Sequence, residues 1–437
     1  MKKVLSIFSI AALLFAAASC NENNGPKPVE ITVQLTSDNV ALAVEGIPVE
    51  LVEASGAATY TENTDASGCA IFKVPAGSYS ASVAYKTVAD GEKLVYSGSV
   101  NVIVEGAVAD PFVLALNKVT SPQIIIKELY CTGCPKNTTG NYTDDAYIIL
   151  YNNSNVEADA SDIVISLVQP GNGHATNKYY VDDKLTYENE NWILAYSAIW
   201  WFKEQVKIPA YSQIVIAIFG GIDHTQTVTA SVNLSDPSYY WMSNTDISTT
   251  FKAAKYSVSE GIPTSHYMTT YPVSAGTAWV ISNNSPALYI GKMDKAAAEA
   301  LSKDTENYER TSLTNAKFPK ANVTDCVEVW SAANVEKSKV RFSADLNSGH
   351  VDITNNLGHT IYRNVDKEAT EALAENAGKI VYNYAGGTFD AATNTGSTDP
   401  SGIDAEASIA AGAHIIYKNT NDSGKDFHER TKASLKK

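Results

Sequence analysis

Two cysteines separated by two residues are the first candidates for chemistry in this sequence. Cys131 and Cys134 form the tetrapeptide CTGC, a spacing found in zinc sites and in thiol–disulfide centres. A zinc site needs a second pair or nearby histidines, and Cys69 and Cys326 stand alone. A redox pair is expected at the start of a helix, whereas CTGC opens a loop rich in Gly, Asn and Thr. We therefore expect either a local disulfide between Cys131 and Cys134 or two free thiols.

Acidic residues near the same loop form a second candidate site. Glu128 lies within one apolar stretch, and Asp144 and Asp145 precede another. If the two stretches pair as strands, the three carboxylates converge, and carboxylate oxygens suit Ca²⁺. The spacing fits no EF-hand loop, however, and an acid at the entry of a strand commonly caps a turn. The sequence therefore favours structural hydrogen bonding here and predicts no metal or cofactor.

The histidines show no catalytic spacing. The chain has 7 histidines, and none forms an HxH, HExxH or HxxxH pattern. The sequence also lacks a GxSxG elbow, a phosphate-binding loop and a dinucleotide fingerprint. Phe427–Arg430, FHER, places a His beside a Glu, and we expect this pair at the surface. We predict a protein that is not an enzyme, with a hydrolase assembled from distant residues as an alternative.

Two aromatic clusters are the best candidates for a binding surface. AIWWF contains Trp200 and Trp201, and SYYWM contains Tyr239, Tyr240 and Trp241. Neighbours on a strand face opposite sides, so one of the two tryptophans is expected in the core. Three consecutive rings between polar turns are hard to bury together. Exposed rings would stack on sugars or anchor a protein partner, and packing under a long loop is the alternative.

Composition and charge exclude other classes of partner. The chain has 437 residues, of which 44% are hydrophobic and 19% are charged, as in ordinary globular proteins with two or three domains. Its formal net charge is −15. This excess of negative charge argues against nucleic acid and against an anionic membrane surface as partners.

The N-terminus has the pattern of an export signal. Lys2 and Lys3 precede the apolar run Val4–Ser19, which is short for a membrane-spanning helix and ends in small residues before Cys20. AASC resembles a bacterial lipobox. This resemblance implies that residues 1–19 are a cleaved signal peptide and that the cysteine becomes the lipidated first residue.

A lipid on Cys20 would attach the mature chain to a membrane. Residues 20–28 are polar, contain Gly and Pro, and suit a tether. Asn21, rather than Asp, follows the cysteine, which favours the outer membrane over the inner one. The sequence does not decide between its periplasmic and external faces.

Residues 29–118 are expected to form a first β domain. Short stretches with alternating apolar residues are separated by turn signals about every ten residues, which favours a sandwich. In the fifth stretch Tyr79, Ala81 and Val83 face one side. The seven expected strands are 29–35, 48–54, 58–64, 69–74, 78–87, 93–104 and 111–116.

Within this domain, Thr64–Val83 (TDASGCAIFKVPAGSYSASV) resembles the carboxypeptidase-regulatory or transthyretin-like sandwich. Gly68 and Gly77 would supply the positive φ that its two turns need. The resemblance implies a structural or adhesive spacer without catalysis.

Residues 119–437 are expected to form a second, larger β domain. Ile124–Tyr130 (IIIKELY) and Ala146–Asn155 (AYIILYNNSN) are expected to pair as strands, with the Asn/Ser run as a turn. They resemble the opening of lamin-tail-like immunoglobulin sandwiches, and Ile208–Ala217 resembles a later strand. Ala/Glu/Lys-rich helices are expected at 295–308 and 366–379, each with an Asp near its start.

The C-terminal Tyr417–Arg430 (YKNTNDSGKDFHER) resembles a closing motif of the same kind. Together these blocks resemble DUF4876, an uncharacterised family of Bacteroides-type lipoproteins. The fold class expected is mainly β, with two immunoglobulin-like or transthyretin-like β-sandwiches, the second carrying helical and loop insertions.

We predict a cell-envelope lipoprotein with a non-catalytic binding role. It would be accessory to an outer-membrane transport or surface complex, with a β-barrel transporter as partner. A surface glycan-binding or adhesion protein is the alternative, and a hydrolase is the second.

Overall fold

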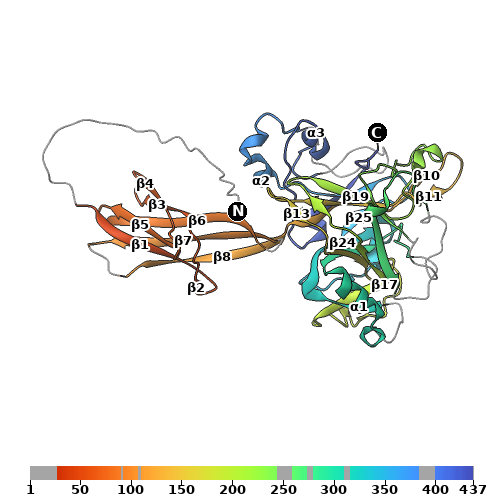
Figure 1. The fold of residues 1–437 in the computed structure, drawn as a ribbon, viewed down its shortest axis with the longest axis horizontal. Helices are drawn as coiled ribbons and strands as arrows, with labels where there is room; N and C mark the ends of the chain where they lie inside the picture. The colour runs from red at the N-terminus through yellow and green to blue at the C-terminus, as the bar shows by residue number, and fades with distance from the viewer. Residues whose placement is uncertain are drawn as a thin grey trace. The chain divides into compact units, whose positions relative to one another are not determined.

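The computed structural model describes residues 27–89, 92–106, 110–243, 258–272, 279–309, 315–382 and 399–436. The chain divides into two compact units (Figure 1). The first unit comprises Met1–Lys86 and Val95–Val119, and the second comprises Thr87–Leu94 and Thr120–Lys437. Both units are built mainly from strands, which confirms the predicted fold class. The expected signal peptide and Cys20 lie outside the described residues.

The strands of the first unit match the predicted ones closely. All seven expected stretches are strands, and one short strand is added after the first. Strand β1 pairs in parallel with β8 and antiparallel with β5, within the order β2-β1-β8-β7-β6-β3-β4. The bounds are β1 (Val29–Ser37), β2 (Val40–Ala41), β3 (Pro48–Glu53), β4 (Thr59–Asn63), β5 (Cys69–Val74), β6 (Gly77–Ala89), β7 (Glu92–Val104) and β8 (Phe112–Pro122).

Alternation along β6 builds the core of this unit. Tyr79, Ala81 and Val83 are buried, as predicted from their spacing. Gly68 has a φ of 81°, and a Cβ there would lie 2.0 Å from the Leu42 carbonyl oxygen, so this turn requires glycine. The same prediction is wrong for Gly77, which has no positive φ because it begins the extended strand β6.

The second unit contains a 13-stranded sheet in the order β25-β24-β22-β14-β17-β21-β20-β19-β12-β9-β26-β27, with β23 paired to β17. Its strands are β9 (Ile124–Tyr130), β12 (Tyr147–Asn152), β14 (Ile163–Leu167), β17 (Trp192–Phe202), β19 (Gln213–Ala217), β20 (Tyr240–Met242), β21 (Tyr267–Pro272), β22 (Ala287–Lys292), β23 (Asn315–Pro319), β24 (Val323–Ser331), β25 (Val351–Ile353), β26 (Thr360–Arg363) and β27 (Phe427–Arg430).

Short two-stranded pairs extend from this sheet. They are β10 (Cys134–Pro135) with β11 (Asn141–Tyr142), β13 (Ala158–Asp159) with β18 (Lys207–Ile208), and β15 (Tyr180–Val181) with β16 (Lys184–Leu185). The α-helices are α1 (Lys295–Lys303), α2 (Lys367–Glu371), α3 (Ala405–Ala410) and α4 (Ser423–Asp426). The 3₁₀ turns are His224–Gln226, Thr264–His266, Thr305–Asn307, Lys320–Asn322, Ala332–Lys337 and Ala374–Asn376.

The predicted pairing of the two apolar stretches is confirmed. Strands β9 and β12 run antiparallel with Tyr130 opposite Tyr147, and β19 pairs with the other edge of β12. The Asn/Ser run that starts at the last residue of β12 does end the strand, but Asn152, Asn153 and Ser154 are buried and Asn155 is exposed. Asn152 donates to the carbonyl oxygens of Val156, Ile208 and Pro209 at 2.6–3.0 Å. The turn therefore ties separate segments together by amide hydrogen bonds.

The helix predicted at 295–308 is α1, but it ends at Lys303 and the 3₁₀ turn Thr305–Asn307 follows it. Its N-terminus is capped by Asp294, whose side chain accepts from the Ala297 amide. The prediction for 366–379 is too long. Helix α2 ends at Glu371 because the backbone is extended at Leu373, and a separate turn follows. There the Asn376 amide bonds the Thr370 and His414 carbonyls.

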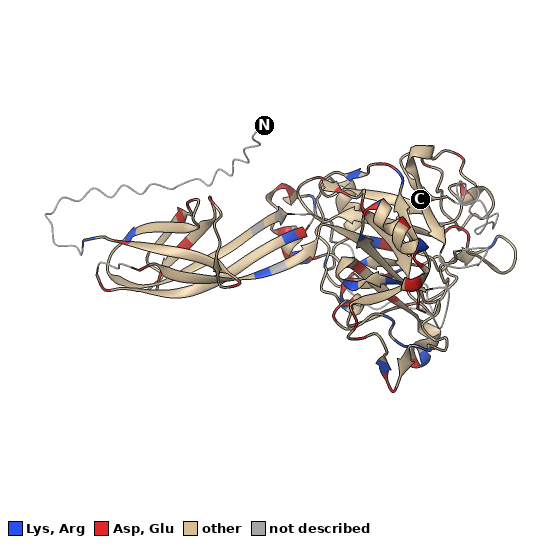
Figure 2. Cartoon of the chain, turned by 60° about the horizontal axis from the view of Figure 1, so that its bottom comes forward, with Lys and Arg blue, Asp and Glu red and all other residues tan. Residues whose placement is uncertain are grey.

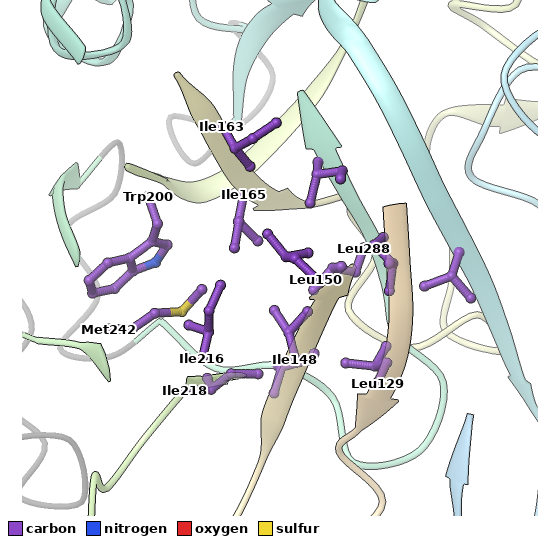
Figure 3. Close-up of a cluster of buried hydrophobic side chains, with 14 of the residues drawn as sticks. Leu129, Ile148, Leu150, Ile163, Ile165, Trp200, Ile216, Ile218, Met242 and Leu288 are labelled. Atoms are coloured by element: carbon purple, nitrogen blue, oxygen red, sulfur yellow. The ribbon is translucent and has the colours of Figure 1, made fainter. Parts of the chain in front are cut away.

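Two hydrophobic clusters fill the space on opposite sides of β17. The central core cluster includes Ile148, Leu150, Ile165, Trp200, Ile216, Met242 and Leu288 (Figure 3). The second core cluster includes Val164, Tyr187, Ile193, Trp201, Tyr289 and Phe318. Because a cluster covers each face of β17, most side chains on both faces of this strand are buried.

Candidate functional site

The predicted aromatic surface is not exposed. Trp200 and Trp201 are 2% and 6% exposed, and they belong to the central and second core clusters respectively. The prediction that they face opposite sides is confirmed, but both sides are buried. Trp200 packs edge-on against Trp279 at 5.9 Å between ring centroids. These rings stabilise the core and present no face to a sugar.

The second aromatic cluster is also packed inside the unit. Trp241 is 1% exposed, donates from Nε1 to the Phe219 carbonyl at 2.5 Å, and lies edge-on to Tyr267. Tyr240 is 9% exposed and stacks on His266. Tyr239 alone is half-buried. Tyr240 and Trp241 are buried together because β20 lies between β19 and β21, which the sequence pattern did not indicate.

The two cysteines of CTGC are free thiols, so the second of the two sequence alternatives holds in this structure. Cys131 is buried in the central core cluster. Cys134 Sγ instead lies 3.5 Å from Asp145 Oδ2. Burial and the neighbouring carboxylate raise the pKa of the Cys134 thiol to about 12, which makes it a poor nucleophile.

Asp145 is the centre of a buried polar network. Its Oδ2 accepts from Ser231 Oγ at 2.6 Å and from Tyr130 OH at 3.1 Å, while Oδ1 has no hydrogen-bond partner among the described residues. Burial raises the pKa of this carboxyl group. Nearby, His224 Nε2 donates to the Gly220 carbonyl, so its Nδ1 accepts from Tyr142 OH at 2.6 Å.

Glu128 is held in a separate network. Its carboxylate accepts from Tyr147 OH at 2.7 Å, from the Ser434 amide at 3.0 Å and from Ser434 Oγ. Within the described ranges, no three His, Cys, Asp or Glu side chains are arranged to hold a metal ion. Of the three acids considered in the sequence, Glu128 and Asp145 form hydrogen bonds that join distant segments, as the structural interpretation predicted.

The FHER segment was expected at the surface, but it is largely buried. It forms β27, and His428 is buried with Nδ1 2.7 Å from Asn364 Oδ1. Burial and the adjacent charge of Arg430 lower the pKa of His428 to about 3. Glu429 instead pairs with His359 Nδ1 at 2.6 Å. The paired histidine is thus remote in sequence, which adjacency could not reveal.

Buried ion pairs form a further group that the sequence gave no means to identify. Arg341 and Glu328 are fully buried, and the guanidinium also donates to the Pro170 and Ser285 carbonyls at 2.8 Å. Arg363 pairs with Asp325. Removing one member of such a pair would leave an uncompensated buried charge.

Lys127 is fully buried, pairs with the partly exposed Glu406 and is enclosed by aromatic rings. Its Nζ lies 2.7 Å from Glu406 Oε1 and within 5.5–5.8 Å of three tyrosine ring centroids, those of Tyr151, Tyr362 and Tyr417. Burial tends to raise the pKa of Glu406, but the charge of Lys127 and hydrogen bonds outweigh it and set that pKa to about 2.

Three of the surface hollows formed by described residues of the second unit are large enough for a small ligand. One of about 410 Å³ includes Asp325 and Cys326 in its lining, and one of about 420 Å³ lies beside α2. The third, of about 350 Å³, combines an aromatic ring with several polar side chains. It is lined by Tyr180, Asp183, Lys184, Leu185, Glu188, Asn189 and Val340. We call this third site the Tyr180 hollow.

The signal for the Tyr180 hollow was present in the sequence but was not recognised. Tyr179 and Tyr180 precede Asp182 and Asp183, a polar turn that reverses the chain between β15 and β16. Both aspartates have positive φ, 49° and 59°, as a two-residue hairpin turn requires. Charged residues of both signs are interspersed in the second unit (Figure 2), so charge alone does not single out this site.

Among the described residues, no helix has the length and apolar character needed to cross a membrane.

Comparison with known proteins gives a match of part of the chain to a family model and a solved structure with a similar fold. Residues 211–385 match the model of DUF4876, described as a protein of unknown function. The search among curated proteins finds no match. The crystal structure of a DUF4876 family protein from Bacteroides thetaiotaomicron aligns with 93% of this chain and 96% of that chain, at 17% identity and a TM-score of 0.55.

Two other solved structures align with low scores. A proposed carbohydrate-binding protein from Pseudomonas aeruginosa covers 21% of this chain and 90% of its own, at 18% identity and a TM-score of 0.17. A DUF3823 family protein from Parabacteroides merdae covers 70% and 99%, at 9% identity and a TM-score of 0.18. Residues 211–385 thus match the DUF4876 family, and the chain shares the fold of a DUF4876 protein from Bacteroides.

Proposed function

We propose that this protein is a lipid-anchored protein of the cell envelope that binds a ligand without transforming it. The main support for the proposal is that several ionisable side chains of the second unit are buried and take part in hydrogen bonds that hold the fold together. Asp145, Glu128 and His428 are buried and bonded to side chains or backbone of other segments. A catalytic acid or base has to reach its substrate. These groups are instead committed to the fold, while polar surface hollows remain accessible to ligands.

The location follows from the N-terminal sequence. The basic start, the apolar run and Cys20 support a lipidated mature chain, and Asn21 supports the outer membrane. We further propose that the whole chain is a DUF4876 member, that its first unit is a transthyretin-like spacer and that its second is a lamin-tail-like recognition unit. Such a protein would be accessory to an outer-membrane β-barrel transporter or surface complex.

A cross-linked pull-down from native outer membranes, read by mass spectrometry, tests this role. The matched control is Cys20→Ala, which cannot be lipidated and should leave the membrane fraction. We expect the lipidated protein to co-purify with a β-barrel transporter and the variant to lose that partner. Recovery of the lipidated protein alone, from cells in which a known complex is cross-linked, would contradict the accessory role.

A second candidate function, glycan binding, is favoured by the Tyr180 hollow. Four of the five rings that first suggested it are buried, but this hollow offers a half-buried tyrosine beside side chains that bond hydroxyl groups.

A further inference from the structure

We propose that the Tyr180 hollow binds a neutral sugar unit of a glycan. This inference rests on the proposed non-catalytic binding function and supplies a site and a ligand class for it. Two walls form the hollow: the β15–β16 hairpin with the residues after it, and the chain around Val340. The inference depends on the rigidity of those walls, the chemistry of the lining and the balance of its charges.

The hairpin wall is anchored by side chains that are buried in the second core cluster. Tyr179, Leu185 and Tyr187 are buried in the second core cluster, and Tyr179 and Tyr187 pack edge-on at 5.8 Å between centroids. The Thr186 amide donates to the Tyr179 carbonyl at 2.8 Å. Since alternate residues are anchored in the core, the residues between them are held facing outward.

Direct hydrogen bonds join the two walls. Tyr187 OH donates to the Arg341 carbonyl at 2.6 Å, and the Ala344 amide donates to Glu188 Oε1 at 2.9 Å. Arg341 is itself locked by its ion pair with Glu328. A ligand therefore meets a largely preformed site and does not have to order a loop, which favours affinity.

The lining matches the two kinds of surface on a sugar ring. Tyr180 supplies a half-buried aromatic ring, and Val340 supplies aliphatic surface for the apolar face of the sugar. Asp183 and Glu188 accept hydrogen bonds as carboxylates, and Asn189 both donates and accepts. A sugar hydroxyl does both as well, so each polar side chain has a suitable partner on one ring.

The charges around the hollow favour a neutral ligand. Two carboxylates, Asp183 and Glu188, line it together with the ammonium group of Lys184. Lys339 Nζ lies 5.4 Å from the centroid of the Tyr180 ring, which adds a second positive charge. Because charges of both signs lie close together, the lining has no strong preference for an anion or a cation. A volume of about 350 Å³ is at the small end of ligand sites and suits one or two sugar rings.

The hollow beside α2 provides a contrast within the same chain. Its Tyr382 ring is 56% exposed, but Tyr382 OH is already bonded to Glu371 Oε1 at 2.6 Å. Apart from Glu371, its other lining side chains are aliphatic, except for the buried amide of Asn376, which is already bonded to backbone. This hollow therefore has an exposed tyrosine but fewer polar side chains than the Tyr180 hollow, and Tyr382→Ala is a suitable control.

The test is affinity electrophoresis of the full-length lipidated protein in a detergent that has no sugar headgroup. The probes are gels containing starch, xylan, mannan or galactomannan, with polygalacturonate as an anionic probe. We expect retardation by at least one neutral polysaccharide. Tyr180→Ala and Asn189→Ala should each raise the apparent Kd about tenfold or more, a loss of one good contact. Tyr382→Ala should bind like the unaltered protein, and all variants should keep the same Tm within a few degrees.

Each outcome either supports or overturns the site. Retardation that Tyr180→Ala retains overturns the hollow as the site, although a binding function would stand. Retardation by polygalacturonate alone overturns the neutral ligand class, and retardation in none of the gels overturns sugar binding. Release of new reducing ends from a polysaccharide would instead contradict the non-catalytic function, so the two failures are distinguishable.

Discussion

Acid should destabilise the second unit through His428, and a substitution can isolate this effect. The ring lies on β27, is buried, and contacts the Tyr362 ring at 5.8 Å between centroids. Its Nδ1–H donates to Asn364 Oδ1, and Nε2 has no hydrogen-bond partner within the described part of the chain. A second proton would have to sit on Nε2, buried and beside the charge of Arg430. His428→Asn keeps a side-chain N–H donor but cannot be protonated.

The expected size follows from the two pKa values. Burial and Arg430 lower the pKa of folded His428 to about 3, against about 6.5 in the unfolded chain. The lowered pKa means that the stability from neutral His428 is complete above pH 6.5 and is lost as the pH falls toward 3. Linkage gives a loss of about 2 kcal/mol in the free energy of unfolding between pH 7.5 and pH 5.

Denaturant unfolding of both proteins at pH 7.5 and pH 5 measures this loss. Several buried aspartates, among them Asp145 and Asp325, have raised pKa values and act in the opposite direction. Their contribution is common to both proteins and cancels in the difference. We expect the stability advantage of the unaltered protein over His428→Asn to shrink by about 2 kcal/mol at pH 5. A difference that stays constant to within about 0.5 kcal/mol would refute the buried, neutral imidazole.

Further substitutions test the buried networks by the same unfolding measurement. Ser434→Ala removes a hydroxyl donor from the buried Glu128 carboxylate and should destabilise the protein by about 1.5–3 kcal/mol; a change below about 0.5 kcal/mol would show that this bond is not formed. Arg341→Met leaves Glu328 buried without its cation and should destabilise by about 3–5 kcal/mol, whereas an unchanged midpoint would contradict the ion pair. Trp241→Ala should lose about 3–5 kcal/mol because the ring is fully buried; a stability like that of the unaltered protein would mean that the ring is exposed after all.

Local patterns in the sequence were sufficient to predict strands. Alternation in 78–87 located β6, and the apolar stretch Ile124–Tyr130 is β9 with identical bounds. Both patterns involve only consecutive residues, so they can be read from the sequence without knowledge of the fold. Gly77 shows the limit of such patterns, because a turn signal indicates where the chain bends but not which residue takes the unusual φ.

The candidate site was predicted less well because burial depends on residues far away in sequence. Trp201 is covered by the second core cluster, which includes Phe318 and Tyr289, more than eighty residues later. The partner of Glu128 is Ser434, and that of Lys127 is Glu406. An aromatic run therefore looked exposed from its polar flanks, and no spacing rule connects the members of these pairs.

Hydrogen–deuterium exchange tests the proposed binding site most directly. The full-length protein would be measured with and without a saturating concentration of the neutral oligosaccharide derived from the polysaccharide that retards it most. We predict slower exchange of backbone amides in residues 179–189 and 339–345, with Tyr180→Ala abolishing the change. Protection elsewhere, such as around Tyr382, or none at saturation, would contradict the Tyr180 hollow as the place where this protein binds its ligand.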